Sequence, residues 1–265
     1  MLLAIDVGNT SITAGVFRGK RLLGQGRIPT RTDRRLASDL KNVLRGKRIA
    51  LQEIQAVIVS SVVPRATAYL RKALANLGLP KPLVLGQNLK APIVNRYRIP
   101  SQVGQDRLVN AVAACELYGG PAIVADFGTA LTIDLVSRRR EYLGGVIVPG
   151  MEMALEALHS RTALLPKIRL ARPAELLGRD TAGSMKSGIF YGYGALCDGI
   201  VGLLKKSHAR GAKVIATGGH VRLIAPFARS IQIVNPNLTL QGLAIVYKTR
   251  LLLRHRTLAD CNDGL

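Results

Sequence analysis

The feature that most constrains the fold is a strand-and-turn pattern that occurs twice in the chain. A short apolar run ends at Asp6-Val7-Gly8-Asn9-Thr10, and Ile12 to Phe17 then forms a second apolar run. Much later, a short apolar run ends at Asp126-Phe127-Gly128-Thr129-Ala130 and is followed by Leu131 to Val136. The two copies lie near the starts of the two halves of the chain. An internal repeat at half the chain length predicts two similar domains.

Both turns have the composition of a phosphate-binding turn. Gly8 and Gly128 allow the backbone to bend tightly and to approach a ligand closely. Several residues after these glycines can donate N–H groups or hydroxyls to phosphate oxygens: Asn9, Thr10, Ser11 and Thr129. An Asp at a strand end can hold a cation beside those oxygens, directly or through water. One such turn could simply close a hairpin, but two copies favour nucleotide binding.

The rest of the chain alternates strand and helix patterns, which predicts an α/β protein. Ala56 to Val59 is an apolar strand followed by a helical stretch from Ala66 to Leu77. A second apolar strand, Lys213 to Ala216, ends at Thr217-Gly218-Gly219-His220. The two glycines would let an adenine or ribose lie against the backbone, and a plain strand-to-helix turn explains them equally well.

Gly104-Gln105-Asp106-Arg107 precedes a helical stretch from Leu108 to Leu117. An Asp at this position can cap the helix or interact with its dipole. It can also accept a proton from a substrate hydroxyl, with Arg107 holding an anion beside it. Residue type alone favours the capping role and leaves both open.

Charge and composition bear on partners and compartment. The 38 Lys and Arg outnumber the 16 Asp and Glu, giving a net charge of +22 that attracts anions, nucleic acid included. The basic residues are dispersed and the chain has no Trp for base stacking, so specific nucleic-acid binding is not expected. No apolar run approaches the roughly 20 residues of a membrane span, and the start does not resemble a signal peptide. We therefore expect a cytoplasmic protein without a membrane segment.

Cysteine and histidine offer no alternative chemistry. The three cysteines, Cys115, Cys197 and Cys261, are isolated, which indicates buried or incidental thiols. The four histidines have neither the spacing of zinc ligands nor a neighbouring Ser or Cys nucleophile motif. Carboxylates and hydroxyls suited to phosphoryl transfer are present instead.

Taken together, the motifs resemble those of the type III pantothenate kinases in order and spacing. The resemblance extends from Met1 to about Tyr247. It rests on seven segments: Asp6 to Thr10, Gly104 to Arg107, Asp126 to Thr129, Gly144 to Gly150, Arg161 to Pro166, Gly178 to Gly188 and Ala216 to Gly219. Any one of them is modest evidence, and seven in sequence are specific.

The resemblance implies an α/β fold of two ribonuclease H-like domains of the actin-like ATPase type, with mixed sheets flanked by helices. It places the active site in the cleft between the domains and implies a homodimer. We expect domains at 1–117 and 118–250, and a basic tail at 251–265 that is partly disordered. The implied reaction is ATP-dependent phosphorylation of pantothenate to 4'-phosphopantothenate, the first step of coenzyme A biosynthesis.

The resemblance also implies roles for individual residues. ATP would be bound by Thr129 and by the first turn, comprising Asp6, Val7, Gly8, Asn9, Thr10, Ser11, Ile12 and Thr13. Asp106 would be the general base, and the pantothenate pocket would be lined by Tyr97, Gly104, Gln105, Asp106, Arg107 and Thr181. Asp126 would bind a monovalent cation, potassium or ammonium, and Asp6 would hold magnesium through water. Gln105 departs from the small residue usual in the family and is expected to narrow or rehydrate the pocket.

Two other functions remain open at this level. One is a kinase for another small hydroxylated acid or sugar, since the superfamily phosphorylates many. The other is a non-catalytic regulator on the same fold, to which the +22 charge would give affinity for nucleic acid.

Overall fold

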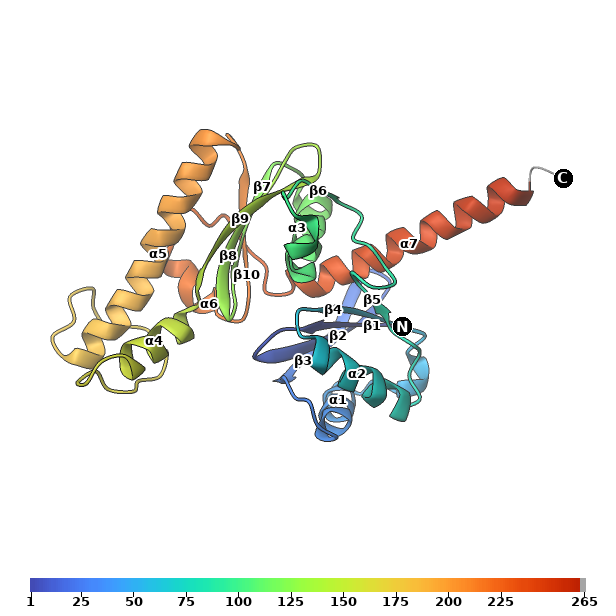
Figure 1. Cartoon of the computed structure of the whole chain (residues 1–265), viewed down its shortest axis with the longest axis horizontal. Helices are drawn as coiled ribbons and strands as arrows, with labels where there is room; N and C mark the ends of the chain where they lie inside the picture. The colour runs from blue at the N-terminus through green and yellow to red at the C-terminus, as the bar shows by residue number, and fades with distance from the viewer. Residues whose placement is uncertain (263–265) are drawn as a thin grey trace. The chain divides into compact units, whose positions relative to one another are not determined.

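The structure, a computed structural model, describes residues 1–262, with side chains as far as residue 253. The chain divides into two compact units. The first comprises Met1–Ile93, Ile99–Glu116 and Thr239–Leu265, and the second comprises Val94–Arg98 and Leu117–Leu238. Each unit is built on one mixed β-sheet with helices packed against it (Figure 1), which confirms the predicted α/β class.

The sheet of the first unit has five strands in the order β3-β2-β1-β4-β5. The strands are β1 (Leu2–Val7), β2 (Ser11–Arg18), β3 (Arg21–Pro29), β4 (Ala56–Ser61) and β5 (Leu83–Val84). The first three form an antiparallel meander, and β4 and β5 continue the sheet in parallel with β1. The carboxyl ends of β1, β4 and β5 therefore lie at one edge, where ligands of open α/β sheets bind.

Helices cover both faces of this sheet because the side chains of β1 alternate between two cores. Leu3, Ile5 and Val7 pack with α1 (Arg35–Gly46) and α2 (Pro64–Asn76). Leu2 and Ala4 pack with α3 (Gln105–Tyr118) and α7 (Leu238–Asn262). Two short 3₁₀ turns, η1 (Leu51–Glu53) and η2 (Pro100–Gln102), complete the unit.

The sheet of the second unit has six strands in the order β11-β10-β7-β8-β9-β6. The strands are β6 (Val94–Asn95), β7 (Ala122–Phe127), β8 (Ala130–Val136), β9 (Glu141–Pro149), β10 (Lys213–Thr217) and β11 (Ile233–Val234). The helical elements are α4 (Met151–Ser160), α5 (Thr181–Ser207), α6 (Val221–Ile224) and η3 (Ala225–Phe227). Ile123, Ala125 and Phe127 of β7 pack in one core with α4, α5 and α6.

The duplication expected from the sequence is visible in the sheet topology. Read from β9 to β11, the second sheet repeats the strand order of the first, and β6 is added at its edge. Even an irregularity recurs: the register shifts between Val16 and Phe17 in β2, and between Leu135 and Val136 at the equivalent point of β8.

The compact units differ from continuous halves of the chain in the position of the last helix. Leu240, Leu243 and Val246 of α7 pack with Leu2 and Phe17, so the chain from Thr239 onward groups with the first unit. The expected domains, 1–117 and 118–250, instead assign the start of α7 to the second domain. The expected tail is helical as far as Asn262, and the rest of it, residues 263–265, lies outside the described residues.

Helix α5 bears on the expectation that the chain has no membrane segment. Helix α5 has an 18-residue window of mean hydropathy 1.3, of which 33% is buried, and so it passes a test of length and composition. This is weak evidence for a span, because the core helix of a soluble protein passes the same test. Met185, Phe190 and Cys197 of α5 are in the core of the second unit. Burial also raises the pKa of the Cys197 thiol to about 11.

Candidate active site

The first predicted phosphate turn is a tight connection between β1 and β2. The N–H of Gly8 donates to the carbonyl oxygen of Ser11 at 3.0 Å. From the end of β3, the Thr30 hydroxyl donates to the Gly8 carbonyl at 2.6 Å, and the Thr30 N–H donates to the Thr10 carbonyl at 3.0 Å. Asn9 and Thr10 at the tip are exposed. The turn is thus anchored at its base and open at its tip.

The remaining residues of this segment divide by the strand alternation. Val7 and Ile12 are buried in the first core, which leaves their backbone groups as the possible contacts to a ligand. Asp6 pairs with Thr13 on β2 and with Ser60 on β4. As an even-numbered residue of β1, Asp6 lies on the sheet face that α3 and α7 cover.

The second predicted turn joins β7 to β8 and has one residue fewer. The N–H of Gly128 donates to the carbonyl oxygen of Ala130 at 3.1 Å. Gly150, immediately before α4, donates its N–H to the Thr129 carbonyl at 3.0 Å, and an added Cβ there would overlap that carbonyl oxygen. The start of α4 is therefore packed directly on this turn. Sequence reasoning assigned no role to Gly150, because a contact between such distant residues has no local signal.

The turn after β10 lies against the same site. Thr217 pairs with Asp126 across the parallel strands. Gly218 has a φ of +98°, and an added Cβ would lie 2.5 Å from Asp126 Oδ1 and 2.5 Å from the Phe127 carbonyl oxygen. The N–H of His220 donates to that carbonyl at 3.1 Å. The structure therefore brings together Asp126 and the Gly218 turn, which the sequence alone left ambiguous.

Asp106 occupies the second position of α3. Its Oδ1 accepts the N–H of the next residue, Arg107, at 2.9 Å within the first turn of the helix. An added Cβ on Gly104 would overlap this same oxygen, so a side chain larger than hydrogen would displace the carboxylate. Arg107 is only 7% exposed. The Gly-x-Asp-Arg motif thus has a local structural reason for its glycine.

A cavity of about 450 Å³ adjoins this motif in the first unit. It lies at the carboxyl ends of β4 and β5 and is bounded by α2, η2 and the start of α3, including Ser61, Thr67, Gln87, Gly104 and Gln105. Gly86, with a φ of +76°, would place an added Cβ 3.0 Å from the Gln105 side chain. The Gln105 side chain therefore packs on the turn after β5 and lines this cavity.

The residues expected to bind the acceptor are divided between the two units. Gly104 to Arg107 belong to the first, and Tyr97 and Thr181 belong to the second. Thr181 is the exposed first residue of α5, and the preceding Asp180 caps that helix by accepting the Gly183 N–H at 2.7 Å.

The donor groups fit cations that are held together with a substrate. Among the described residues, no group of three or more His, Cys, Asp or Glu side chains is arranged to hold a metal. Magnesium is commonly held by one or two carboxylates together with substrate phosphates and water, and Asp6 is a carboxylate of this kind at the end of β1. Asp126 Oδ1 and the Phe127 carbonyl oxygen converge beside Gly218, and oxygen donors of this kind suit a monovalent cation.

Comparison with known proteins identifies close sequence relatives. The family model for type III pantothenate kinase matches residues 2–202. A type III pantothenate kinase of Moorella thermoacetica is 44% identical over 94% of this chain and 99% of its own length. One from Geobacter sulfurreducens is 44% identical over 94% of this chain and 98% of its own length.

Solved structures support the fold. The activator of 2-hydroxyisocaproyl-CoA dehydratase from Clostridium difficile, solved with bound ADPNP, matches with a TM-score of 0.56 at 12% identity. The match covers 97% of both chains. The match supports the expected fold, in which two mixed sheets are flanked by helices.

Proposed function

This chain belongs to the type III pantothenate kinase family, and we propose that it transfers the γ-phosphoryl group of ATP to the primary hydroxyl of pantothenate. The product is 4'-phosphopantothenate, and the reaction is the first step of coenzyme A biosynthesis. The observation that carries this function is the 44% identity to a type III pantothenate kinase over 94% of the chain.

Asp106 is the general base in this proposal. Phosphoryl transfer passes through a loose transition state, so the protein has to position the hydroxyl and accept its proton as the bond forms. The contact of Asp106 Oδ1 with the Arg107 N–H and the tight approach of Gly104 support a fixed carboxylate orientation. Arg107 is the proposed partner of the pantothenate carboxylate, because a guanidinium pairs well with a carboxylate.

The two turns are the proposed phosphate sites. Asp6 to Thr13 and Thr129 would contact ATP through backbone N–H groups and hydroxyls, and Asp6 would hold magnesium through water. A metal ion bound there would neutralise charge on the phosphates. Support comes from the open tip at Asn9 and Thr10, and from the anchored geometry that Thr30 and Gly150 give to the two turns.

A coupled assay of ADP release tests the function. We expect turnover with pantothenate and none with acetate or common sugars, because the chain belongs to a family that acts on pantothenate. Turnover of a sugar without turnover of pantothenate would support the other kinase hypothesis instead.

A monovalent cation at Asp126 makes the rate depend on the salt used. Replacing potassium by sodium at constant ionic strength is expected to lower kcat, because the smaller ion does not fit oxygens set for potassium or ammonium. The Asp126→Asn variant is expected to lose this difference, since the charged ligand is gone. Equal rates of the parent chain in both salts would remove Asp126 from the cation role.

A homodimer is also part of the proposal. The second unit exposes several large apolar side chains on β9, α4, the segment before α5, and α5 itself, including Ile147, Met153, Leu164, Leu176, Leu177 and Leu203. Exposed apolar side chains supply surface that a dimer interface could bury. Light scattering is expected to report the mass of two chains, and the mass of one chain would exclude the dimer.

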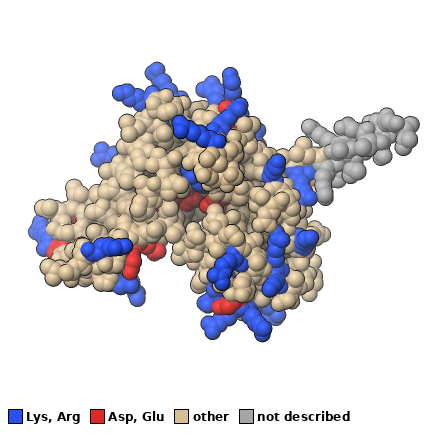
Figure 2. Space-filling view, in the orientation of Figure 1, with Lys and Arg blue, Asp and Glu red and all other residues tan. Residues whose placement is uncertain are grey.

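We further propose a cytoplasmic enzyme without specific nucleic-acid binding. Figure 2 shows Lys and Arg side chains spread over the visible face rather than gathered in one patch. Binding of DNA is therefore expected to be weak and to vanish by moderate salt, because it would depend on counterion release alone. Tight binding at physiological ionic strength, measured by fluorescence anisotropy, would favour the regulator hypothesis.

A further inference from the structure

The segment that carries Tyr97 is held in the second unit by very little backbone pairing. Strand β6 has two residues, and Val94 and Asn95 pair with Glu141 and Tyr142 at the edge of the sheet. The chain on either side of Val94–Arg98 belongs to the first unit. A two-residue edge strand contributes few ladder hydrogen bonds, and the Arg96 N–H adds one more to the Tyr142 carbonyl at 2.9 Å, so side-chain contacts supply much of what remains to hold this segment.

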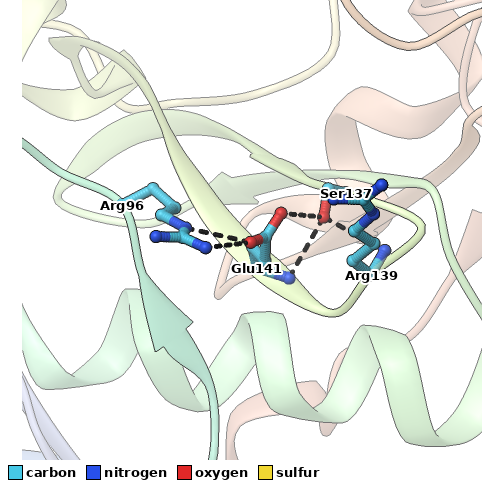
Figure 3. A network of polar contacts seen from close by, with 4 residues as sticks. All are labelled: Arg96, Ser137, Arg139 and Glu141. Carbon is cyan, nitrogen blue, oxygen red and sulfur yellow. Dashed lines mark hydrogen bonds and ion pairs between the residues drawn. The ribbon is translucent and has the colours of Figure 1, made fainter.

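An ion pair makes the first of these contacts (Figure 3). Arg96 donates from Nε at 2.9 Å and from Nη2 at 2.7 Å to Oε1 of Glu141, which follows the β8–β9 turn. The Ser137 hydroxyl donates to Oε2 of the same carboxylate at 3.1 Å, and Ser137 Oγ also accepts the Glu141 and Arg139 N–H groups. Hydrogen bonds from Arg96 and then Ser137 lower the pKa of Glu141. Glu141 is therefore ionised at neutral pH.

The second contact supports the ring of Tyr97 itself. The rings of Tyr97 and Tyr142 have centroids 6.4 Å apart at 45°. Tyr142 is 0% exposed, and its hydroxyl donates at 2.9 Å to Asp134, which is 1% exposed. Gly144, with a φ of +126°, would place an added Cβ 3.5 Å from the Tyr97 ring. The Tyr97 ring thus lies next to the buried Tyr142 ring and to the backbone at Gly144.

The two contacts come from consecutive residues just after β6 and reach consecutive residues at the start of β9. Arg96 reaches Glu141, and the next residue, Tyr97, packs on the next residue of β9, Tyr142. We propose that the Arg96–Glu141 pair positions Tyr97 for pantothenate, and so sets the affinity for the acceptor rather than the rate of the chemical step. This inference rests on the proposed function, in which Tyr97 lines the pantothenate pocket.

Glu141→Gln tests the inference, because it removes the charge and preserves the shape of the side chain. The KM for pantothenate is expected to rise about two- to fivefold, the size expected for a solvent-accessible ion pair. The kcat and the KM for ATP are expected to stay within experimental error of the parent. Glu53→Gln is the control: it breaks another Arg–Glu pair, Arg18–Glu53 at 3.3 Å, in the first unit, where the carboxylate side chain is 49% exposed against 17% for Glu141. It is expected to change none of the three constants.

A double-mutant cycle separates positioning from general stability. Arg96→Ala is expected to raise the KM for pantothenate as Glu141→Gln does, and the double variant is expected to be no worse than either single variant. Arg96→Lys keeps a cation next to Glu141 and is expected to restore most of the parent affinity. Melting temperatures measured in parallel report any loss of folding.

Three results would overturn the inference. An unchanged KM for pantothenate in an active Glu141→Gln variant would show that the pair does not position Tyr97. A joint fall of kcat, both affinities and melting temperature would show a structural role only. If the parent chain itself fails to phosphorylate pantothenate, the proposed function fails first, and this inference fails with it.

Discussion

Asp106→Asn is expected to keep the affinity for ATP and to lower kcat by about 10²–10⁴-fold, the contribution of one general acid or base. Asparagine has nearly the same shape and can still accept the Arg107 N–H, so the start of α3 is preserved. What it lacks is the capacity to take the hydroxyl proton of pantothenate. Isothermal titration with an ATP analogue and initial-rate kinetics with pantothenate measure the two effects separately.

A control variant separates the loss of the base from a change in the local hydrogen bond to the backbone. Asp33 accepts the Arg35 N–H at 2.9 Å at the start of α1, which is a similar local contact away from the proposed site. Asp33→Asn is expected to retain the kcat of the parent. If Asp106→Asn retained it as well, the base would have to be another residue, and a capping role for Asp106 would be sufficient.

Gly150→Ala is the second substitution with a large expected effect, because it should displace the turn that carries Thr129. The added methyl group would overlap the Thr129 carbonyl oxygen, and the three nearest atoms are all backbone atoms of the turn, which leaves little room for relief. Overpacking of this kind costs about 1–3 kcal/mol. If that cost falls on the ATP-bound arrangement of the turn, ATP binds about fivefold to hundredfold more weakly. Titration with ATP and thermal melting check this expectation.

Gly202→Ala provides the matched glycine substitution. Gly202 lies in α5 with nothing within 4 Å of an added Cβ. Alanine there is expected to leave ATP affinity unchanged and to stabilise the helix by about 0.5–1 kcal/mol. Equal ATP affinity in Gly150→Ala and in the parent would separate the second turn from nucleotide binding.

The features predicted from sequence are those that short segments determine. An apolar strand, an Asp, a tight turn and a second strand are encoded within about fifteen residues, so the amino-acid pattern alone predicts both hairpins and their recurrence. The Gly-x-Asp-Arg motif also has a local explanation, since Gly104 and Asp106 are two residues apart and nearly touch.

Contacts between segments far apart in the chain could not be predicted from the sequence. The contact of Gly150 with the turn at Thr129, the approach of Gly218 to Asp126, and the addition of β6 beside β9 join segments about 20 to 90 residues apart. Gln105 illustrates the same difficulty: its departure from the family pattern was evident, but its packing on Gly86 was not. The roles of the individual site residues also stay predictions, because they depend on contacts with bound substrates.

The return of α7 to the first sheet has a consequence for biosynthesis. The strands of the first unit leave the ribosome early, yet Leu2 and Phe17 meet Leu240 and Leu243 only after almost the whole chain has been translated. The second unit, apart from its five-residue edge segment, is one continuous stretch that ends at Leu238 and so can be complete before that. The part of the enzyme synthesised first is therefore the last to acquire its full apolar cover, and nascent chains stalled before Thr239 should be the ones that need chaperones.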